Sequence, residues 1–199
     1  MSTRIIVPHR GLEQAKTRLA GVLDPAQRAA LAEWLLRHVL DAAVATEHEV
    51  VVISPDASLE PLAMAAGAQL AVQHGLGLNA GLAQARDEAL RDGVAVLAVL
   101  HGDLPDLSPA DVTAMLAAVS PRGPAVAIAP DAAGRGTNGL ALTPPDVIGF
   151  QFGRDSFAAH RTAAERSGAR FAVVERPGLA FDVDTPQDLA AWLARGHAA

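Results

Sequence analysis

The chain has 199 residues, half of them apolar, a formal net charge of −6 and no cysteine. This length and apolar content predict a single domain, residues 1–199, with a sizeable core. The acidic balance, without any basic run, argues against a nucleic-acid partner, and the lack of cysteine excludes disulfides, thiolate metal sites and a cysteine nucleophile. No apolar run reaches the length of a membrane span and no apolar leader is evident, so we expect a soluble cytoplasmic protein.

A buried strand is expected at residues 4–8, and the loop after it carries the one lysine of the chain. Of sixteen lysine and arginine residues, only Lys16 is a lysine. Where arginine is the usual basic residue, a lysine suggests a site that needs a compact point charge; the alternative is a surface lysine retained by chance. A P-loop would need glycine where the chain has Arg10 and Ala15. A phosphate-binding loop that relies more on side chains remains an alternative.

Patterns typical of alternating helices and strands follow this loop. They predict a capped helix from Asp24 to about Val44, a buried strand at 50–53, a short helix ending at Gly67 and a short strand at 70–72. Asn79 fits the N-cap of a helix that continues to about Asp92. Two glycines shortly before it would let the backbone approach a ligand, although a lone Gly-x-Gly is a weak signal.

The most apolar stretch of the chain, Val94 to Leu100, predicts a central strand. Asp103 follows it and would therefore lie at the carboxyl end of a buried strand, where ligands of such sheets usually bind. Further on, the sequence predicts a capped helix from Ser108, strands at 125–129 and 140–142, a helix from about Ser156 and a last long strand at 171–174.

The glycine-rich segment 130–139 allows two interpretations. Its backbone N–H groups could hold an anion, with Thr137 as an added donor, or it could be a hairpin-like connection between strands. Ser156 at a helix N-terminus suits a phosphate or a carboxylate. His160 lies one turn further along the same helix face, and a lone histidine in such a place is more often structural or solvated.

Near the end of the chain, Asp182 and Asp184 alternate with Val183. In an extended strand both carboxylates would project to the same side, where a cation would relieve their repulsion. Thr185 then reads as the N-cap of a helix that continues to about Arg195, so the pair would lie where a strand ends and a helix begins. The alternative is that both aspartates are turn and capping residues. The alternation of about six or seven strands with helices predicts a three-layer α/β/α domain.

Several of these segments occur together in the order of one known family. They are Ala15-Lys16-Thr17-Arg18-Leu19, Gly77-Leu78-Asn79, Gly102-Asp103-Leu104-Pro105, Gly136-Thr137-Asn138, Phe152-Gly153 with Ser156 and His160, and Asp182-x-Asp184-Thr185-Pro186. The set covers nearly the whole chain and resembles the CofC-type guanylyltransferases. Those enzymes make the phosphodiester precursor of the deazaflavin coenzyme F-420 by attaching GMP from GTP to 2-phospho-L-lactate, phosphoenolpyruvate or 3-phosphoglycerate, with release of pyrophosphate.

The resemblance implies a fold and a set of site residues. The fold would be that of the nucleotide-diphospho-sugar transferases, with a mixed, mostly parallel sheet. The chain would take GTP and a small phosphorylated acid, form a homodimer and pass its product to a downstream transferase. The implied residues are Asp103, Asp182 and Asp184 for Mg²⁺, Thr137, Gly153 and Ser156 for the acceptor, Pro8, Gly11, Lys16, Arg18 and Asn79 for the nucleotide, and Lys16 and Asp103 for catalysis.

The residue chemistry agrees with this implication, because three aspartates without cysteine suit a hard, oxygen-liganded cation such as Mg²⁺. The acceptor phosphate is already ionised at neutral pH, so the reaction needs no strong general base. Two alternatives stay open. One is a related nucleotidyltransferase that acts on a sugar phosphate or the molybdenum cofactor, and the other is a nucleotide-binding module without catalysis.

Overall fold

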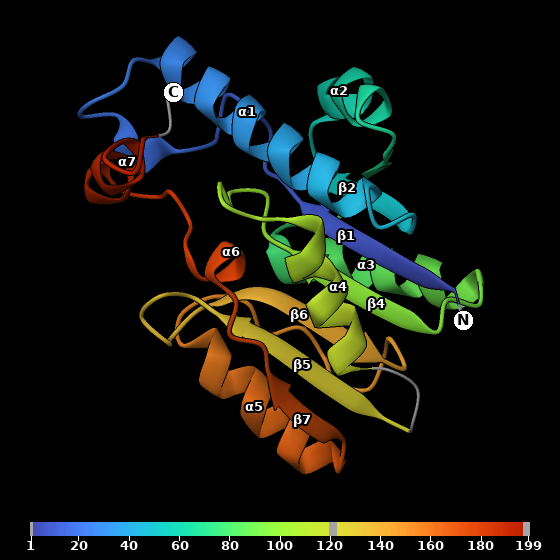
Figure 1. The fold of residues 1–199 in the computed structure, drawn as a ribbon. Coiled ribbons are helices and arrows are strands. Elements are labelled where there is room, and N and C mark those ends of the chain that lie inside the picture. Colours follow the sequence, from blue (N-terminus) through green and yellow to red (C-terminus); the bar gives the residue numbers. More distant parts are fainter. Residues whose placement is uncertain (1, 120–122, 197–199) are drawn as a thin grey trace.

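A seven-stranded sheet forms the centre of the molecule. The computed structural model describes residues 2–119 and 123–196, and in it the strands lie in the order β3-β2-β1-β4-β6-β5-β7 (Figure 1). All neighbouring strands are parallel except β6, which is antiparallel to both β4 and β5. The predicted mixed, mostly parallel sheet is confirmed. The strands are β1 Thr3–Pro8, β2 Glu49–Ser54, β3 Gln69–Val72, β4 Val96–Leu100, β5 Ala125–Pro130, β6 Thr137–Thr143 and β7 Arg170–Val173.

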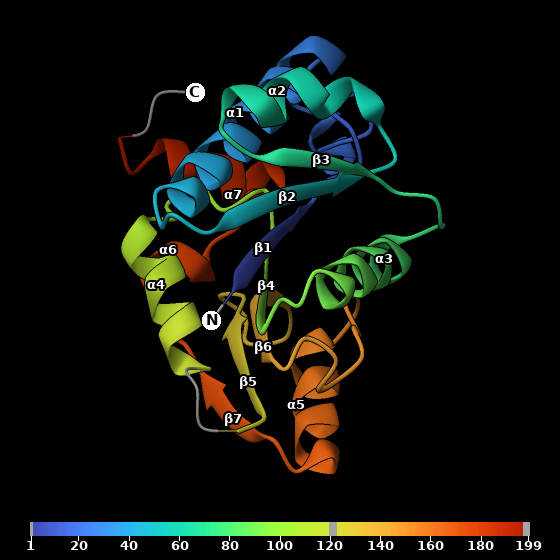
Figure 2. The same cartoon turned by 90° about the vertical axis from the view of Figure 1, so that its right-hand side faces the viewer.

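Helices cover both faces of the sheet, which gives the three layers expected from the sequence (Figure 2). Helices α1, α2, α4 and α6 pack on one face, and α3 and α5 pack on the other. The helices are α1 Pro25–Val44, α2 Glu60–Ala65, α3 Leu78–Arg91, α4 Pro109–Ala118, α5 Ser156–Ser167, α6 Pro177–Ala180 and α7 Pro186–Leu193, with 3-10 turns η1 Thr17–Leu19 and η2 Ala57–Leu59.

The central strands are apolar throughout because both of their faces are buried. In β1, Ile5 and Val7 join the core under α1 and α4, whereas Ile6 joins the opposite core under α3. The same alternation divides β4, where Ala98 and Val99 enter opposite cores. A strand buried on two faces loses the apolar–polar alternation of a surface strand, which explains the continuous apolar run in this part of the sequence.

Three helix starts that the sequence predicts are confirmed by their capping contacts. Asp24, Ser108 and Thr185 each accept a hydrogen bond from the backbone N–H three residues later, and each forms a complete capping box with a proline in the first turn. These contacts involve only four consecutive residues, so local sequence determines them.

The prediction that Asn79 caps a helix is wrong. Helix α3 begins at Leu78, and Gly77 precedes it with a φ of 87°, a value that glycine tolerates best. The Asn79 side chain instead exchanges two hydrogen bonds with the backbone of Phe152, donating at 3.0 Å and accepting at 2.9 Å. The Asn79 amide therefore joins the helix to a distant loop instead of capping it.

The last strand and the segment after it also differ from the prediction. Strand β7 is a four-residue edge strand that ends at Val173, one residue before the expected end. The chain then forms the short helix α6, and residues 181–184 continue without joining the sheet. The aspartate pair therefore lies between two helices, not at the end of a strand.

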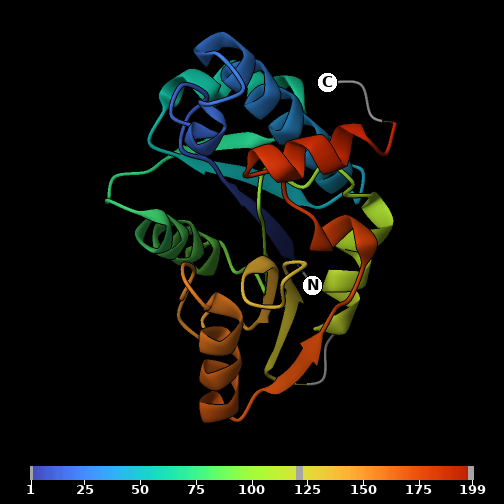
Figure 3. The same ribbon diagram turned by 90° about the vertical axis from the view of Figure 1, so that its left-hand side faces the viewer.

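Helix α7, drawn in red, lies beside the blue first part of the chain (Figure 3), and a third apolar cluster joins the two. Trp192 and Val183 are fully buried there against Leu19, Leu31 and Leu35. This packing holds the loop after β1 beside the segment that carries the two aspartates. Within residues 2–119 and 123–196, no helix combines the length and apolarity needed to cross a membrane.

Candidate functional site

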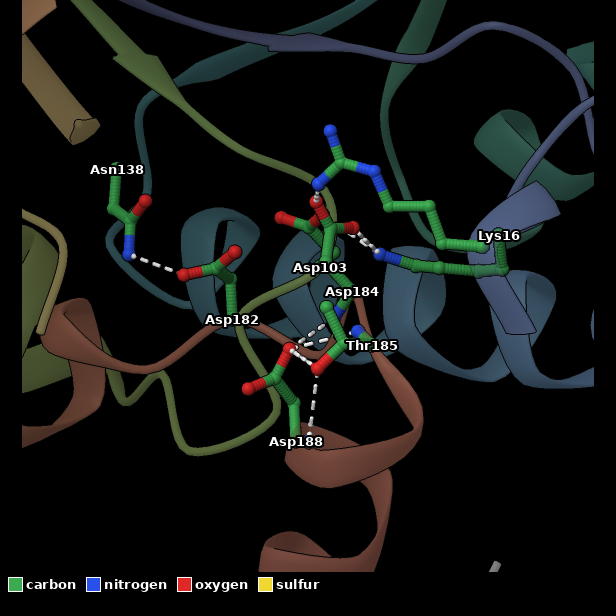
Figure 4. Close-up of polar contacts among 8 residues, drawn as sticks. Lys16, Asp103, Asn138, Asp182, Asp184, Thr185 and Asp188 are labelled. Carbon is green, nitrogen blue, oxygen red and sulfur yellow. Dashed lines mark hydrogen bonds and ion pairs between the residues drawn. The ribbon is translucent and has the colours of Figure 1, made fainter. Parts of the chain in front are cut away.

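Three segments that are distant in sequence meet at the carboxyl edge of β1 and β4 (Figure 4). The loop after β1 contributes Lys16, the turn after β4 contributes Asp103, and the segment between α6 and α7 contributes Asp182 and Asp184. Because β6 is antiparallel, its first residues reach the same edge, where the backbone O of Asn138 accepts from the His101 N–H at 3.0 Å. Parallel sheets bind ligands at this edge.

The acidic residues form one cluster, in which Asp103, Asp182 and Asp184 each offer a carboxylate oxygen within 4.8 Å of the others. Val183 is fully buried in the third apolar cluster, so its neighbours on either side project away from that core. The backbone N–H of Val183 also donates to the backbone oxygen of Asp103 at 3.3 Å. The prediction that both carboxylates share one side is confirmed, although burial of Val183 achieves it without a strand.

The Lys16 ammonium lies among these carboxylates. It donates to Asp103 Oδ2 at 2.7 Å and to Asp184 Oδ1 at 3.0 Å, and its side chain is only 7% exposed. Burial opposes the charged form, but Asp103 and then Asp184 outweigh it and raise the pKa of Lys16. Lys16 is thus not a surface lysine, and the compact point charge expected from the sequence has two defined partners.

The carboxyl groups of the cluster differ in their ionisation. Burial opposes the ionisation of Asp103, yet Lys16 and then His101 hold the pKa of its carboxyl below the ordinary value. Among the described residues, Asp182 forms no ion pair with a cation. Burial, followed by repulsion from Asp103, raises the pKa of Asp182 to about 6, and a hydrogen bond from Asn138 Nδ2 at 3.3 Å only partly opposes this.

The oxygen atoms of the acidic cluster are suited to bind a divalent cation. Among the described residues, Asp103 Oδ1 is buried and has no hydrogen-bond partner. A buried carboxylate oxygen without a partner is costly unless a cation or water meets it. Three clustered carboxylates are the hard oxygen ligands that Mg²⁺ and related ions prefer. The acidic cluster is therefore a candidate metal site.

The loop after β1 depends on one glycine at a close contact. Gly11 has a φ of 98°, and a Cβ atom there would lie 2.6 Å from Asp56 Oδ2. Arg18, 73% exposed, extends back toward the cluster, with Nη1 3.5 Å from Asp184 Oδ2. The loop leaves β1 at Pro8, so the structure places four of the predicted nucleotide residues, Pro8, Gly11, Lys16 and Arg18, on one segment beside the acidic cluster. The fifth, Asn79, lies instead against Phe152.

A second polar group lies at the start of β6, facing α5. The segment 130–139 forms a hairpin between β5 and β6, which is the second of the two interpretations given above. Thr137 and Ser156 are each 2% exposed, and Ser156 Oγ donates to Thr137 Oγ1 at 3.1 Å. Gly153, with a φ of 136°, lies in the loop between β6 and α5, just before Ser156. The predicted acceptor residues therefore come from two neighbouring segments.

Two residues gain contacts that the sequence did not indicate. Asn138 adjoins Thr137 but points to the opposite face, where it donates to the backbone oxygen of Leu179 at 3.0 Å as well as to Asp182. His160 is fully buried and contacts Thr137. Both residues belong to motifs given in the sequence analysis. Their contacts could not be predicted, because the partners are distant in sequence and only the fold brings them close.

Comparison with known proteins gives consistent matches. The family described as "Guanylyl transferase CofC like" matches residues 3–199. A phosphoenolpyruvate guanylyltransferase of Rubrobacter xylanophilus is 46% identical over 98% of this chain and 96% of its own length. A 3-phospho-D-glycerate guanylyltransferase of Phenylobacterium zucineum is 39% identical over 96% of this chain and 89% of its own.

The fold has a counterpart among solved structures. A candidate nucleotide-diphospho-sugar transferase from Desulfovibrio desulfuricans superposes with a TM-score of 0.83 at 22% identity, over 100% of this chain and 90% of the other. At that identity the match bears on the fold alone. The family match over nearly the whole chain is decisive for the classification. The chain belongs to the CofC-like guanylyltransferases.

Proposed function

We propose that this protein transfers GMP from GTP to a three-carbon phosphorylated acid and releases pyrophosphate. The observation that carries the proposal is the Lys16 ammonium, held 2.7 and 3.0 Å from two members of a three-aspartate cluster. A nucleoside triphosphate brings several negative charges, and its transfer depends on alignment and charge neutralisation more than on covalent chemistry. The Lys16 ammonium and a metal ion at the adjacent candidate site would together supply the positive charge for this neutralisation.

Asp103, Asp182 and Asp184 would hold Mg²⁺ in this proposal. The bound ion would neutralise charge on the phosphates and on the departing pyrophosphate. Support comes from the unpartnered Asp103 Oδ1 and from the closeness of the carboxylates. In the loop after β1, Pro8 and Gly11 would shape the backbone around the triphosphate, while Lys16 and the exposed Arg18 would contact its oxygens. Asn79 would support the nucleotide from the other side of the site.

The acceptor would bind at Thr137, Gly153 and Ser156. One of its phosphate oxygens attacks the α-phosphorus of GTP, a new P–O bond forms, and the bond to the bridging oxygen breaks with its electron pair leaving on pyrophosphate. The attacking oxygen is already ionised at neutral pH, so no residue need remove a proton. This agrees with the depressed pKa values of His9 and His160, both about 4, which make both imidazoles weak bases.

Phosphoenolpyruvate is the first acceptor to test, because the relative at 46% identity carries that name. The relative named for 3-phospho-D-glycerate makes that acid the second candidate. 2-Phospho-L-lactate differs from phosphoenolpyruvate by only two hydrogens and is the third. In the organism, the product would serve the cytoplasmic synthesis of coenzyme F-420 through a downstream transferase, with residues 1–199 acting as one domain and two chains forming a homodimer.

The test is pyrophosphate release from GTP and Mg²⁺ with each acid supplied separately and a downstream transferase present to trap the product. Turnover with one acid supports the proposal and identifies the acceptor. Asp103→Asn should abolish this turnover in a folded protein. Asp106→Asn is the matched control, because Asp106 lies in the same turn but pairs with Arg195 at 3.0 Å outside the cluster.

Absence of pyrophosphate release with all three acids would reject the proposal. GTP binding combined with turnover of a sugar phosphate would then favour the related nucleotidyltransferases. GTP binding without pyrophosphate release from any acceptor would favour a module without catalysis. Retained activity in Asp103→Asn, Asp182→Asn and Asp184→Asn would remove the metal assignment while leaving the reaction in place.

A further inference from the structure

His160 has two hydrogen-bond partners that together fix the position of its proton. Its Nε2 atom lies 2.9 Å from the backbone N–H of Gln151, and its Nδ1 atom lies 3.2 Å from Thr137 Oγ1. A backbone N–H can only donate, so Nε2 must accept and carries no hydrogen. In a neutral imidazole the single proton is then on Nδ1, which donates to the Thr137 hydroxyl.

The surroundings of His160 favour this neutral form. The ring is fully buried and meets the edge of the Phe152 ring, with the centroids 4.8 Å apart. Burial, followed by the nearby His101, lowers the pKa of His160 to about 4. The histidine is thus held as one tautomer by the loop that carries Gly153 on one side and by β6 on the other.

The direction of this hydrogen bond has a consequence for the two hydroxyls. His160, Thr137 and Ser156 bring three protons, but only two contacts join them. Ser156 donates to Thr137, and His160 does the same, so both lone pairs of the threonine oxygen are used. Within the part of the chain that the structure describes, neither hydroxyl has any further partner. Because Ser156 is the donor in the contact between the two hydroxyls, the proton left over is that of Thr137, and it points out of the group of three.

We propose that His160 is a positioning residue that makes the Thr137 hydroxyl an obligate donor to the anionic group of the acceptor. The inference rests on the proposed function and deepens it. A hydroxyl with two accepted bonds can only donate, so its ligand must be a hydrogen-bond acceptor such as a carboxylate or phosphate oxygen. Thr137 directly precedes Asn138, whose side chain reaches Asp182 from the opposite face of β6, so the two sites are linked through adjacent residues of one strand.

Two substitutions separate the two bonds of the imidazole. In His160→Asn the amide nitrogen takes the place of Nδ1 and keeps a donor toward Thr137. In His160→Gln the amide takes the place of Nε2, so it keeps an acceptor for the Gln151 N–H and loses the donor. With phosphoenolpyruvate as the probe, we expect His160→Gln to raise the KM for the acid about tenfold or more, and His160→Asn to change it only about twofold. The KM for GTP should stay unchanged in both.

A double-mutant cycle tests whether the effect passes through the threonine hydroxyl. Thr137→Val removes that hydroxyl, and in its background His160→Gln should add no further rise in KM for the acid. His38→Asn serves as the control, since His38 lies in α1 and stacks there on Trp34. Equal KM values for His160→Gln and His160→Asn, or additive effects in the cycle, would overturn the proposal.

Nitrogen-15 NMR of the imidazole gives a readout that is independent of turnover. The proposal requires the tautomer with the proton on Nδ1 in the free protein at pH 7. A proton on Nε2 overturns it even if GMP transfer is observed. Conversely, the Nδ1 tautomer without turnover of any of the three acids would reject the proposed function, and the role in acceptor binding falls with it, while the assignment of the proton would stand.

Discussion

Removal of the Lys16 charge should lower the stability of the protein in the absence of metal and raise its affinity for metal. In Lys16→Met, the carboxylates of Asp103 and Asp184 lose a cation that lies 2.7 and 3.0 Å away. At an effective dielectric constant near 20, each pair is worth about 5 to 6 kcal/mol before desolvation. Breaking a buried pair costs about 3 to 5 kcal/mol net. Because Asp184 is 41% exposed, water recovers part of the loss, and we expect the lower limit.

A loss of about 3 kcal/mol in a domain of this length corresponds to a fall in Tm of about 6 to 12 °C. Thermal denaturation in a chelator should show this fall. On titration with Mn²⁺ or Mg²⁺ the difference in Tm between wild type and variant should shrink, since in the wild type the ion competes with the ammonium for the same oxygens. We expect the metal affinity of Lys16→Met to rise about tenfold, so that saturating metal recovers about 1.4 kcal/mol, or roughly half of the lost stability. Activity should not return, because the triphosphate would lose its lysine.

Arg18→Met is the matched control. It removes the same charge from the same loop, but Arg18 is 73% exposed and lies 3.5 Å from Asp184, so the change in stability should stay within about 0.5 kcal/mol. Two results would refute the reasoning. One is a metal affinity in Lys16→Met equal to or weaker than that of the wild type, and the other is an equal loss of stability in the two variants.

Three further predictions concern the segment that carries the aspartates. With chelator present, Asp182→Asn should raise the Tm at pH 7 but not at pH 4. The pKa of Asp182 is about 6 in the folded protein and 3.8 in the unfolded chain, so the folded wild type binds more protons between these values. Its free energy of unfolding therefore falls by up to about 2 to 3 kcal/mol as the pH rises through that window. An equal difference at both pH values would contradict this. Gly178→Ala places a Cβ against Asp111 Oδ2 and the backbone oxygen of Asp106, so it should lower the stability by about 1 to 3 kcal/mol and weaken metal binding. Gly149→Ala is the control, because its Cβ would point into open space, and it should have neither effect. Thr185→Ala removes the N-cap of α7 and should cost about 1 kcal/mol in chemical denaturation, while Thr185→Ser should keep most of it; equal losses would argue against the capping role.

Local sequence was sufficient for the features that a few neighbouring residues control. The three capping boxes need only a polar residue, a proline and a partner at the third position. The common side of Asp182 and Asp184 follows from burial of the residue between them, whether or not the backbone joins a sheet. The division of the chain into alternating strands and helices was likewise predictable, because the central strands are apolar on both faces.

Features that depend on distant partners were not predictable from the sequence. Asn79 is a residue type favoured at N-caps and lies where the sequence predicts one. In the structure, a loop more than seventy positions away forms hydrogen bonds with both ends of its amide. The glycine-rich segment 130–139 fits an anion cradle as well as a hairpin, and the hairpin is seen only once β5 pairs with β6. Nothing local indicates that Asn138 reaches Asp182 or that Gln151 fixes the proton of His160.

The reversed direction of β6 explains how one strand serves both parts of the site. In a fully parallel sheet, residues at the start of a strand lie at the opposite edge from the ligand. Here the start of β6 meets the carboxyl ends of its neighbours, and alternation along the strand sends Thr137 toward α5 and Asn138 toward α6. Under the proposed function, the donor for the acceptor and the support for a metal ligand are then adjacent residues on one rigid element. Since transfer between two bound phosphates depends on their alignment, a shift of this strand should disturb both sites together.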